Sequence, residues 1–275
     1  MRIARYSAGF GRVEDDHLIP MGSDISDFFS ASEWEDGDPI DLSTVVLLPP
    51  LPPTSKLIGV GPNYLEHATE AGQVSPESAD DMIVMAMFAN SLVGHGATVH
   101  IPASTQKVDF EAELGVVIGR TARDVSVGDS LEYVAGYVCV NDLTDRHNQF
   151  RLGGLRGLIR SKTVDEFLPV GPYLTTADEV GDPQELTITC SVNNEELQRA
   201  STRDMTFGVA EIIASLSKTI TLLPGDMIAT GSPPGIGWGR NPQRFLDPGD
   251  VVTVEIDKVG TLTNRLARRD SGTLR

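Results

Sequence analysis

The sequence predicts an α+β fold in which strands predominate. Short strand-like runs recur along the chain, and two of them, residues 114–118 and 133–140, have the near-continuous hydrophobicity of strands buried on both faces. Asn193-Asn194 is typical of a hairpin turn between two further strands. Helical signals are fewer: a short segment that stops at Gly72, and residues 205–216, whose apolar positions follow the 3–4 spacing of an amphipathic helix.

The composition favours a small-molecule partner. The 275 residues include 22 Lys and Arg against 39 Asp and Glu, and the formal net charge of −17 opposes binding to nucleic acid or to anionic membranes. Cys139 and Cys190 lie in apolar runs without another ligand at metal spacing, so we expect them to be core residues of a reduced protein. Since neither a signal-peptide pattern nor an apolar run of membrane-spanning length is seen, we expect a soluble, cytoplasmic protein.

A proline cluster at residues 49–53 predicts a domain boundary, because it fits an extended connector better than a helix or a central strand. Residues 1–53 are expected to form a small β-rich N-terminal domain with this connector, with strands at 2–6 and 13–19. Residues 54–275 are expected to form the catalytic domain. Its predicted elements are strands at 56–61, 82–88, 186–192, 227–230 and 251–256, helices at 63–72 and 205–216, and irregular loops at 73–81 and 146–157.

The segment from Val108 to Gly119 carries the clearest chemical signal. Asp109, Glu111 and Glu113 alternate along it, so in an extended chain their side chains share one face next to the apolar run. Carboxylates in that position repel one another and resist desolvation unless a cation or strong donors meet them. Asp142 follows the next buried strand and could complete an oxygen-rich site for Mg²⁺, Mn²⁺ or Ca²⁺.

Two ordinary explanations compete with a metal site. Acidic residues are frequent in this chain, and pairs two residues apart also occur by chance, as at Glu33 and Glu35. Asp142 could instead cap a helix over residues 143–149. The apolar run attached to Glu111 and Glu113 favours the metal site, because the solvated pair at Glu33 has no such run.

His67 and Glu70 form a second candidate pair. They are three residues apart in a predicted helix, where a carboxylate can orient an imidazole and raise its basicity. An exposed His–Glu pair without function has the same spacing. If the pair is catalytic, the polar loop at 73–81 is a candidate lid.

Two loops are expected to face a ligand. Residues 146–157, rich in Arg and Gly, include Arg146 and Gln149 as candidate substrate contacts. Residues 231–237 contain glycines that would let backbone amides approach a bound anion. The second loop lacks the Gly-Lys-Ser/Thr ending of a phosphate-binding loop.

Seven blocks, in this order, together resemble the fumarylacetoacetate hydrolase family from about Lys56 to Leu266: residues 60–67, 89–94, 109–114, 141–146, 161–162, 230–233 and 248–252. The resemblance implies a mixed β-roll with flanking helices after a small N-terminal domain, usually as a homodimer. It also implies roles for individual residues: Glu111, Glu113 and Asp142 as ligands of Mg²⁺ or Mn²⁺ (Ca²⁺ in a crystal), His67 with Glu70 in the lid that activates water, Lys162 beside the reacting oxygen, and Thr230 with Gly231 at the substrate carboxylate.

The resemblance implies an enzyme that acts on a 2-oxo or 2,4-dioxo acid. The reaction we expect is hydrolysis of a carbon–carbon bond, as in an acylpyruvate hydrolase. A hydratase, isomerase or decarboxylase of a 2-oxo (di)enoic acid from aromatic catabolism is the enzymic alternative. The non-enzymic alternative is a family member that binds a metal or a metabolite without turnover, because Met87 and His147 depart from the usual family pattern.

Met87 replaces a lysine found in many relatives. If this position faces the ligand, methionine offers an apolar contact in place of an ammonium group, and the nearby end of the substrate should be uncharged. If it points into the core, it has no bearing on specificity. The pattern of the strand allows both.

Overall fold

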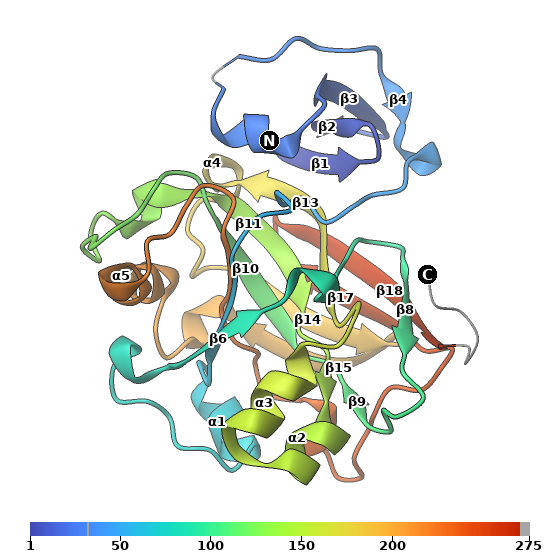
Figure 1. Ribbon diagram of the computed structural model, residues 1–275, viewed down its shortest axis with the longest axis vertical. Helices are drawn as coiled ribbons and strands as arrows, with labels where there is room; N and C mark the ends of the chain where they lie inside the picture. The colour runs from blue at the N-terminus through green and yellow to red at the C-terminus, as the bar shows by residue number, and fades with distance from the viewer. Residues whose placement is uncertain (32, 270–275) are drawn as a thin grey trace.

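The computed structural model describes residues 1–31 and 33–269, and it is built mainly of strands (Figure 1). The 11-stranded sheet contains, in spatial order, β4 (Ile40–Asp41), β3 (His17–Gly22), β2 (Gly9–Glu14), β1 (Arg2–Tyr6), β13 (Leu168–Thr176), β11 (Val134–Asn141), β10 (Ala112–Ile118), β16 (Met227–Ala229), β5 (Leu57–Gly61) and β6 (Ile83–Met87), with β7 (Leu92–Val93) beside β13. A 5-stranded sheet has the order β15 (Glu195–Ser201), β14 (Thr187–Val192), β17 (Val251–Ile256), β18 (Gly260–Arg268) and β8 (Thr98–Ile101). The short strands β9 (Val108–Asp109) and β12 (Thr144–Asp145) pair with each other.

The helices lie around these sheets (Figure 1). They are α1 (Leu65–Glu70), α2 (Arg146–Leu152), α3 (Gly154–Lys162), α4 (Ala177–Val180) and α5 (Val209–Thr219). Within the described ranges, no helix is both long enough and apolar enough to cross a membrane.

Two apolar clusters lie on opposite faces of the large sheet. Alternate residues of β10 divide between them: Leu114 and Val116 belong to the larger cluster, whereas Val117 belongs to the other. The larger cluster includes Ile188 of β14, and the smaller one includes Ile3 of β1. All seven residues of β10 are buried, which confirms the strand predicted from its apolar run.

The first strands continue the large sheet, because β1 pairs with β13 in antiparallel register. Figure 1 shows β1 to β4 above the rest of the chain. The strand predicted at 13–19 was wrong: a turn with Asp15 in the left-handed region (φ 48°) separates the end of β2 from β3. Aspartate tolerates this conformation in tight turns. The domain boundary at residue 53 remains a prediction.

Three other expectations need correction. Residues 146–157 are helical rather than irregular, since α2 begins where the Asp145 side chain accepts a hydrogen bond from the Asn148 N–H. The segment 82–88 contains the predicted strand, but it is an edge strand whose Ile83 and Val84 are exposed. The helix expected from residue 205 begins only at Val209.

Candidate active site

Three buried carboxylates, those of Glu111, Glu113 and Asp142, meet at one end of β10 and β11. One oxygen from each lies within 4.8 Å of the others. The register of the two strands places Ala112 opposite Asn141, so the residues that flank this pair become neighbours. The backbone fixes them further, because the Glu111 N–H donates to the Asn141 side chain (3.1 Å) and the Asp142 N–H donates to the Glu111 carbonyl (2.8 Å).

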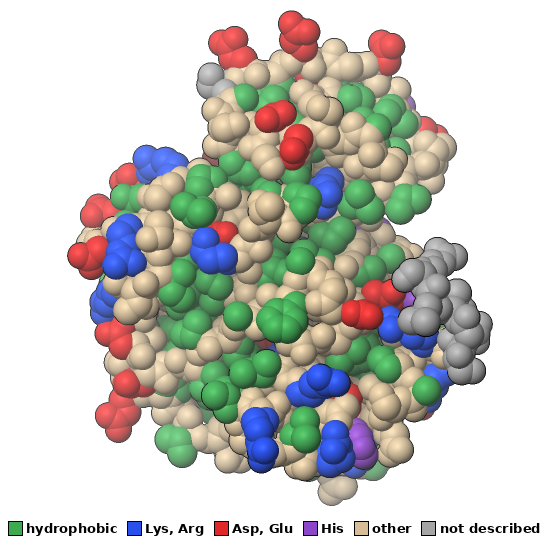
Figure 2. Space-filling model, viewed as in Figure 1, with side chains coloured by type: hydrophobic (Ala, Val, Ile, Leu, Met, Phe, Trp, Pro, Cys, Tyr) green, Lys and Arg blue, Asp and Glu red, His purple; other side chains and the backbone are tan. Residues whose placement is uncertain are grey.

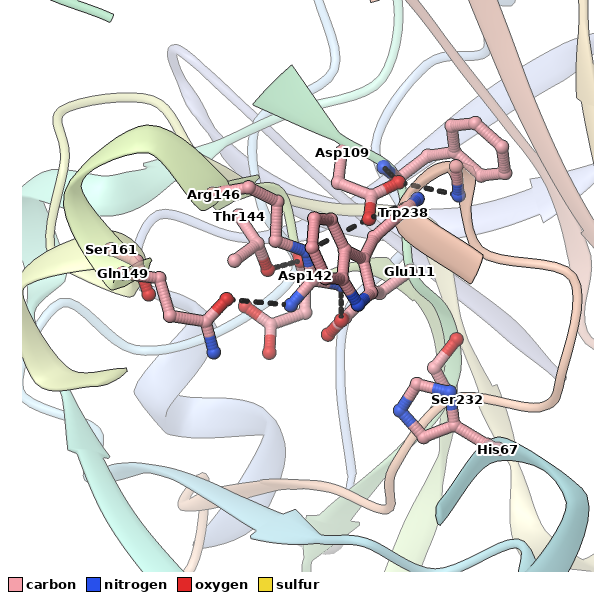
Figure 3. A network of polar contacts seen from close by, with 12 residues as sticks. His67, Asp109, Glu111, Asp142, Thr144, Arg146, Gln149, Ser161, Ser232 and Trp238 are labelled. Carbon is pink, nitrogen blue, oxygen red and sulfur yellow. Dashed lines mark hydrogen bonds and ion pairs between the residues drawn. The ribbon is translucent and has the colours of Figure 1, made fainter. Parts of the chain in front are cut away.

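Two buried cations, those of Lys162 and Arg146, face these carboxylates, and Figure 3 shows the one of Arg146. Lys162, at the end of α3, donates from Nζ to Glu111 Oε2 (2.6 Å) and also to Asp142 Oδ2. Arg146, at the start of α2, donates from Nε to Asp109 Oδ2 (2.8 Å) and from a terminal nitrogen to Glu111 Oε1. The formation of α2 and α3 therefore brings both positive charges to the strand ends.

Burial and neighbouring charges set the protonation of the three carboxyl groups. Burial alone would raise the pKa of Glu111, but the charges of Lys162 and Arg146 outweigh it and hold this pKa at about 2. Burial raises the pKa of Asp142 to about 6, with a further contribution from the charge of Glu111. Burial, and then the charge of Asp142, raises the pKa of Glu113 well above its ordinary value.

The residues present fit a divalent cation. When ionised, Asp109, Glu111, Glu113 and Asp142 carry four negative charges against the two positive charges of Arg146 and Lys162. Asp142 Oδ1 is buried and has no hydrogen-bond partner among the described residues. An unpaired buried carboxylate oxygen is costly unless a cation or a donor meets it. The oxygen-only set suits a hard ion such as Mg²⁺ or Mn²⁺.

Asp109 is not part of this triad, although the alternation along the strand placed it on the same face. Residues 110 and 111 separate β9 from β10, so the regular alternation does not extend back to Asp109. Its carboxylate accepts hydrogen bonds from the backbone N–H groups of Gly237 (2.7 Å) and Trp238 (3.1 Å), and it pairs with Arg146. Asp109 thus anchors Arg146 and the loop after β16.

The glycine-containing loop donates its amides to anions, but these are carboxylates of the protein itself. The Gly231 N–H donates to Glu113 Oε2 (2.8 Å), and the Gly235 N–H donates to Glu70 (3.1 Å to Oε2). Glu70 also lies so close to Gly239 that a Cβ at that position would come within 2.0 Å of Glu70 Cγ. The loop therefore links the triad to α1.

His67 projects from α1 into the same cavity and is 9% exposed. Its Nδ1 lies 3.7 Å from Glu70 Oε2, which is too long for a hydrogen bond, and it has no other hydrogen-bond partner in the described chain. The structure brings His67 and Glu70 together, with Glu70 hydrogen-bonded to the loop amide of Gly235.

A cavity of about 60 Å³ contains most of the predicted site residues. Its lining includes the predicted site residues His67, Glu111, Glu113, Asp142, Arg146, Gln149, Lys162 and Gly231, and also the polar side chains of Gln73 and Ser232. Gln149 accepts a hydrogen bond from Arg146 (2.8 Å), which fixes its position at the edge of the cavity (Figure 3).

Two predicted substrate contacts lie elsewhere. Met87 is 6% exposed and belongs to the apolar cluster that includes Ile3. Its side chain therefore points into the core, which was one of the two orientations that the sequence allowed. Met85, two residues earlier, lines the cavity in its place. Thr230 is fully buried, and its hydroxyl donates to the Leu114 carbonyl (2.9 Å).

Several residues that support the site were missed from the sequence. The Asn63 amide donates to the carbonyls of Phe207 (3.0 Å) and Thr230 (2.9 Å) and thereby holds the chain before α1 against the end of β16. Gln198 accepts from the Ala112 N–H (3.0 Å) and donates to Ser232 (2.9 Å). Asn63 lies in the matched block 60–67, but neither amide has a local pattern that predicts its contacts.

Comparison with known proteins identifies the family. Residues 56–267 match the family model described as fumarylacetoacetate (FAA) hydrolase C-terminal. The chain is 40% identical over 222 residues to the mitochondrial oxaloacetate tautomerase of Xenopus laevis, a match that covers 81% of this chain and 68% of the relative.

Solved structures agree with this match. The 5-carboxymethyl-2-hydroxymuconate delta-isomerase of Mycobacterium smegmatis superposes with a TM-score of 0.82 at 29% identity, covering 98% of this chain and 100% of the isomerase. The maleylpyruvate hydrolase of Sphingobium sp. SYK-6, solved with manganese(II) and pyruvate, gives a TM-score of 0.77 at 30% identity with coverage of 98% and 100%.

The chain, whose β-rich fold holds a buried acidic triad, is thus similar to enzymes that include a tautomerase, an isomerase and a hydrolase. The chain belongs to the fumarylacetoacetate hydrolase family, as its sequence blocks predicted.

Proposed function

We propose that this protein is a divalent-metal-dependent enzyme that hydrolyses a carbon–carbon bond in a 2,4-dioxo acid. The observation that carries the proposal is the buried triad with its unpaired Asp142 oxygen, which adjoins His67 and Lys162 in one cavity. Glu111, Glu113 and Asp142 would hold Mg²⁺ or Mn²⁺. The ion, when bound, would supply a Lewis acid for the carboxylate and ketone oxygens of a 2-oxo acid.

The remaining residues have separable roles. His67 takes a proton at Nε2 from the water that attacks the distal carbonyl, and a small movement of Glu70 away from Gly235 would let its carboxylate accept from Nδ1–H and orient the ring. Lys162 offers its ammonium group near the ketone oxygen, where negative charge develops as the carbon–carbon bond breaks. The water oxygen ends in the released carboxylic acid, and a proton returned to the methylene carbon completes the pyruvate product.

Arg146 would act on the reaction indirectly. Its guanidinium is occupied by Asp109, Glu111 and Gln149, so we assign it to positioning Glu111 and Gln149 rather than to binding the substrate carboxylate. Gly231 remains a candidate substrate contact, because it lines the cavity beside Glu113.

An enol–keto tautomerase or an isomerase is the second candidate. It is favoured by the X. laevis relative, an oxaloacetate tautomerase, and by the fact that Glu70 is hydrogen-bonded to Gly235 rather than to His67. Tautomerisation needs a proton transfer at carbon but no activated water. A hydratase or a decarboxylase would bind the carboxylate and ketone oxygens of its 2-oxo acid, the head group, at the same carboxylate triad.

Turnover assays separate these possibilities. Protein stripped of metal and reloaded with Mg²⁺ or Mn²⁺ is incubated with acetylpyruvate and with oxaloacetate. Hydrolysis yields pyruvate and acetate from acetylpyruvate, whereas a tautomerase accelerates only the enol–keto exchange of oxaloacetate. If neither compound is consumed or interconverted above the metal-only rate, the proposed class is wrong.

A further inference from the structure

An uncharged pocket opens directly from the cavity of the carboxylate triad. It has a volume of about 430 Å³ and is formed by α2, α3 and the edge strand β6. Gln73, Ile83, Gln149 and Leu158 line both hollows, so the pocket is a continuation of the cavity. A substrate whose head group lies at the triad would extend into it.

The lining of this pocket is apolar. Within the described chain it consists of two glutamines, two glycines and four apolar side chains, those of Ile83, Phe150, Leu155 and Leu158. Phe150 is 49% exposed and Leu155 is 65% exposed, so water covers these surfaces until something replaces it. The centroids of the Phe150 and Trp238 rings are 4.2 Å apart. The Trp238 backbone N–H donates a hydrogen bond to Asp109.

Charged side chains of both signs lie around this pocket but outside its lining. Gln73 and Ile83 also line a third hollow, over residues 74–81, whose lining includes Glu77 and Asp81. On the face shown in Figure 2, Lys and Arg side chains gather over α2 and α3. Arg156 and Arg160 are exposed on α3, and the pocket lining does not include them.

We propose that this pocket, lined by Ile83, Phe150, Leu155 and Leu158, binds the distal end of the substrate, and that this end is uncharged. A carboxylate there would lose hydration without gaining a cation, whereas an alkyl chain would bury apolar surface. The inference rests on the proposed function, because it takes the triad as the site of the 2-oxo acid head group. The expectation of an uncharged distal end therefore depends on the lining of this pocket and not on Met87, because Met85 and not Met87 lines the cavity.

Binding, rather than turnover, tests this inference, so the outcome does not depend on which reaction is catalysed. Calorimetric titrations in saturating Mg²⁺ compare 2-oxohexanoate with 2-oxoadipate, which have the same chain length but differ by a distal carboxylate. Oxalate, which has no tail, reports on the head-group site. We expect wild-type protein to bind 2-oxohexanoate at least about tenfold more tightly than 2-oxoadipate.

Leu155→Lys places an ammonium group in the pocket at an exposed helical position. It should bring the affinity ratio close to one or invert it, while the affinity for oxalate stays unchanged. Ile159→Lys is the matched control, because residue 159 lies on the same helix, is 40% exposed and is not part of the lining. The control adds the same charge and should keep the wild-type ratio.

The possible failures are distinguishable. Equal affinity for the two tailed acids in wild-type protein, or the same shift in both lysine variants, would overturn the assignment of the pocket and leave the proposed function standing. If neither tailed acid nor oxalate binds in the presence of Mg²⁺, the proposed function itself fails, and the pocket assignment fails with it.

Discussion

Replacing Glu113 by glutamine should separate the stability of the protein from its ability to bind metal. Glutamine keeps the size of the side chain and an oxygen that can accept from the Gly231 N–H. It removes one negative charge from a buried cluster in which burial and the charge of Asp142 raise the pKa of Glu113. In the metal-free protein the substitution therefore relieves repulsion, and the melting temperature should not fall.

The same substitution should weaken metal binding. Metal at 100 times its Kd stabilises a protein by about 2.7 kcal/mol. The unfolding entropy of a 275-residue chain is about 0.6 kcal/mol/K, so the wild-type melting temperature should rise by about 5 °C. Loss of one of three charged ligands should weaken metal binding by about 100-fold or more. At the same metal concentration the stabilisation by metal then falls to about 0.4 kcal/mol, and the melting temperature should rise by under about 1 °C.

Thermal unfolding with and without Mn²⁺ measures both effects. Glu195→Gln, an exposed position on β15, is the matched control and should keep the full rise. A rise of about 5 °C in Glu113→Gln would refute the assignment of Glu113 as a ligand, and a large loss of stability in the metal-free variant would contradict the predicted relief of repulsion.

His67→Ala should lower kcat by on the order of 10²–10⁴-fold while the Mn²⁺-induced rise in melting temperature persists; near wild-type turnover would assign the proton transfer to another group. Arg146→Met leaves Asp109 buried without its cation and Glu111 with Lys162 alone, so urea unfolding should show a loss of about 3–5 kcal/mol, and a loss below about 1 kcal/mol would contradict this role. Because Asp142 has a pKa of about 6, protons compete with metal, and the affinity for Mn²⁺ should fall by about tenfold per pH unit below about pH 6; a flat profile between pH 5 and 7 would count against Asp142 as a ligand. The folded-state pKa of Asp142 lies above the ordinary 3.8, so its contribution to stability is present at low pH and is lost as the pH rises through about 6. The metal-free protein should therefore lose stability over the same pH interval in which metal binding strengthens.

The sequence predicted those parts of the fold that depend on local pattern. The apolar run at 114–118 predicted a strand buried on both faces, and it lies in β10. Asn193 and Asn194 both have positive φ (52° and 67°), as a tight hairpin requires. The strand across 13–19 failed because Asp15 and Asp16 form a turn between β2 and β3.

Features that depend on long-range pairing could not be predicted in this way. Residues 146–157 contain glycines that suggest a loop, yet Asp145 caps a helix there and the ion pairs of Arg146 fix its start. Asp109 has the same local spacing as Glu111, and long-range contacts with Arg146 and with the backbone N–H groups of Gly237 and Trp238 show that it is an anchor rather than a ligand. None of these contacts leaves a periodic signal in the sequence.

The central claim is that Glu111, Glu113 and Asp142 bind one divalent cation that receives a 2-oxo acid. The most direct test is a crystal grown with Mn²⁺ and oxalate, with diffraction data recorded for the anomalous scattering of manganese. The account predicts one strong anomalous peak within about 2.5 Å of an oxygen from each of the three carboxylates, with oxalate bound to the ion on the side of the cavity. The absence of a peak between these carboxylates, or a peak only at surface acidic residues, would contradict it.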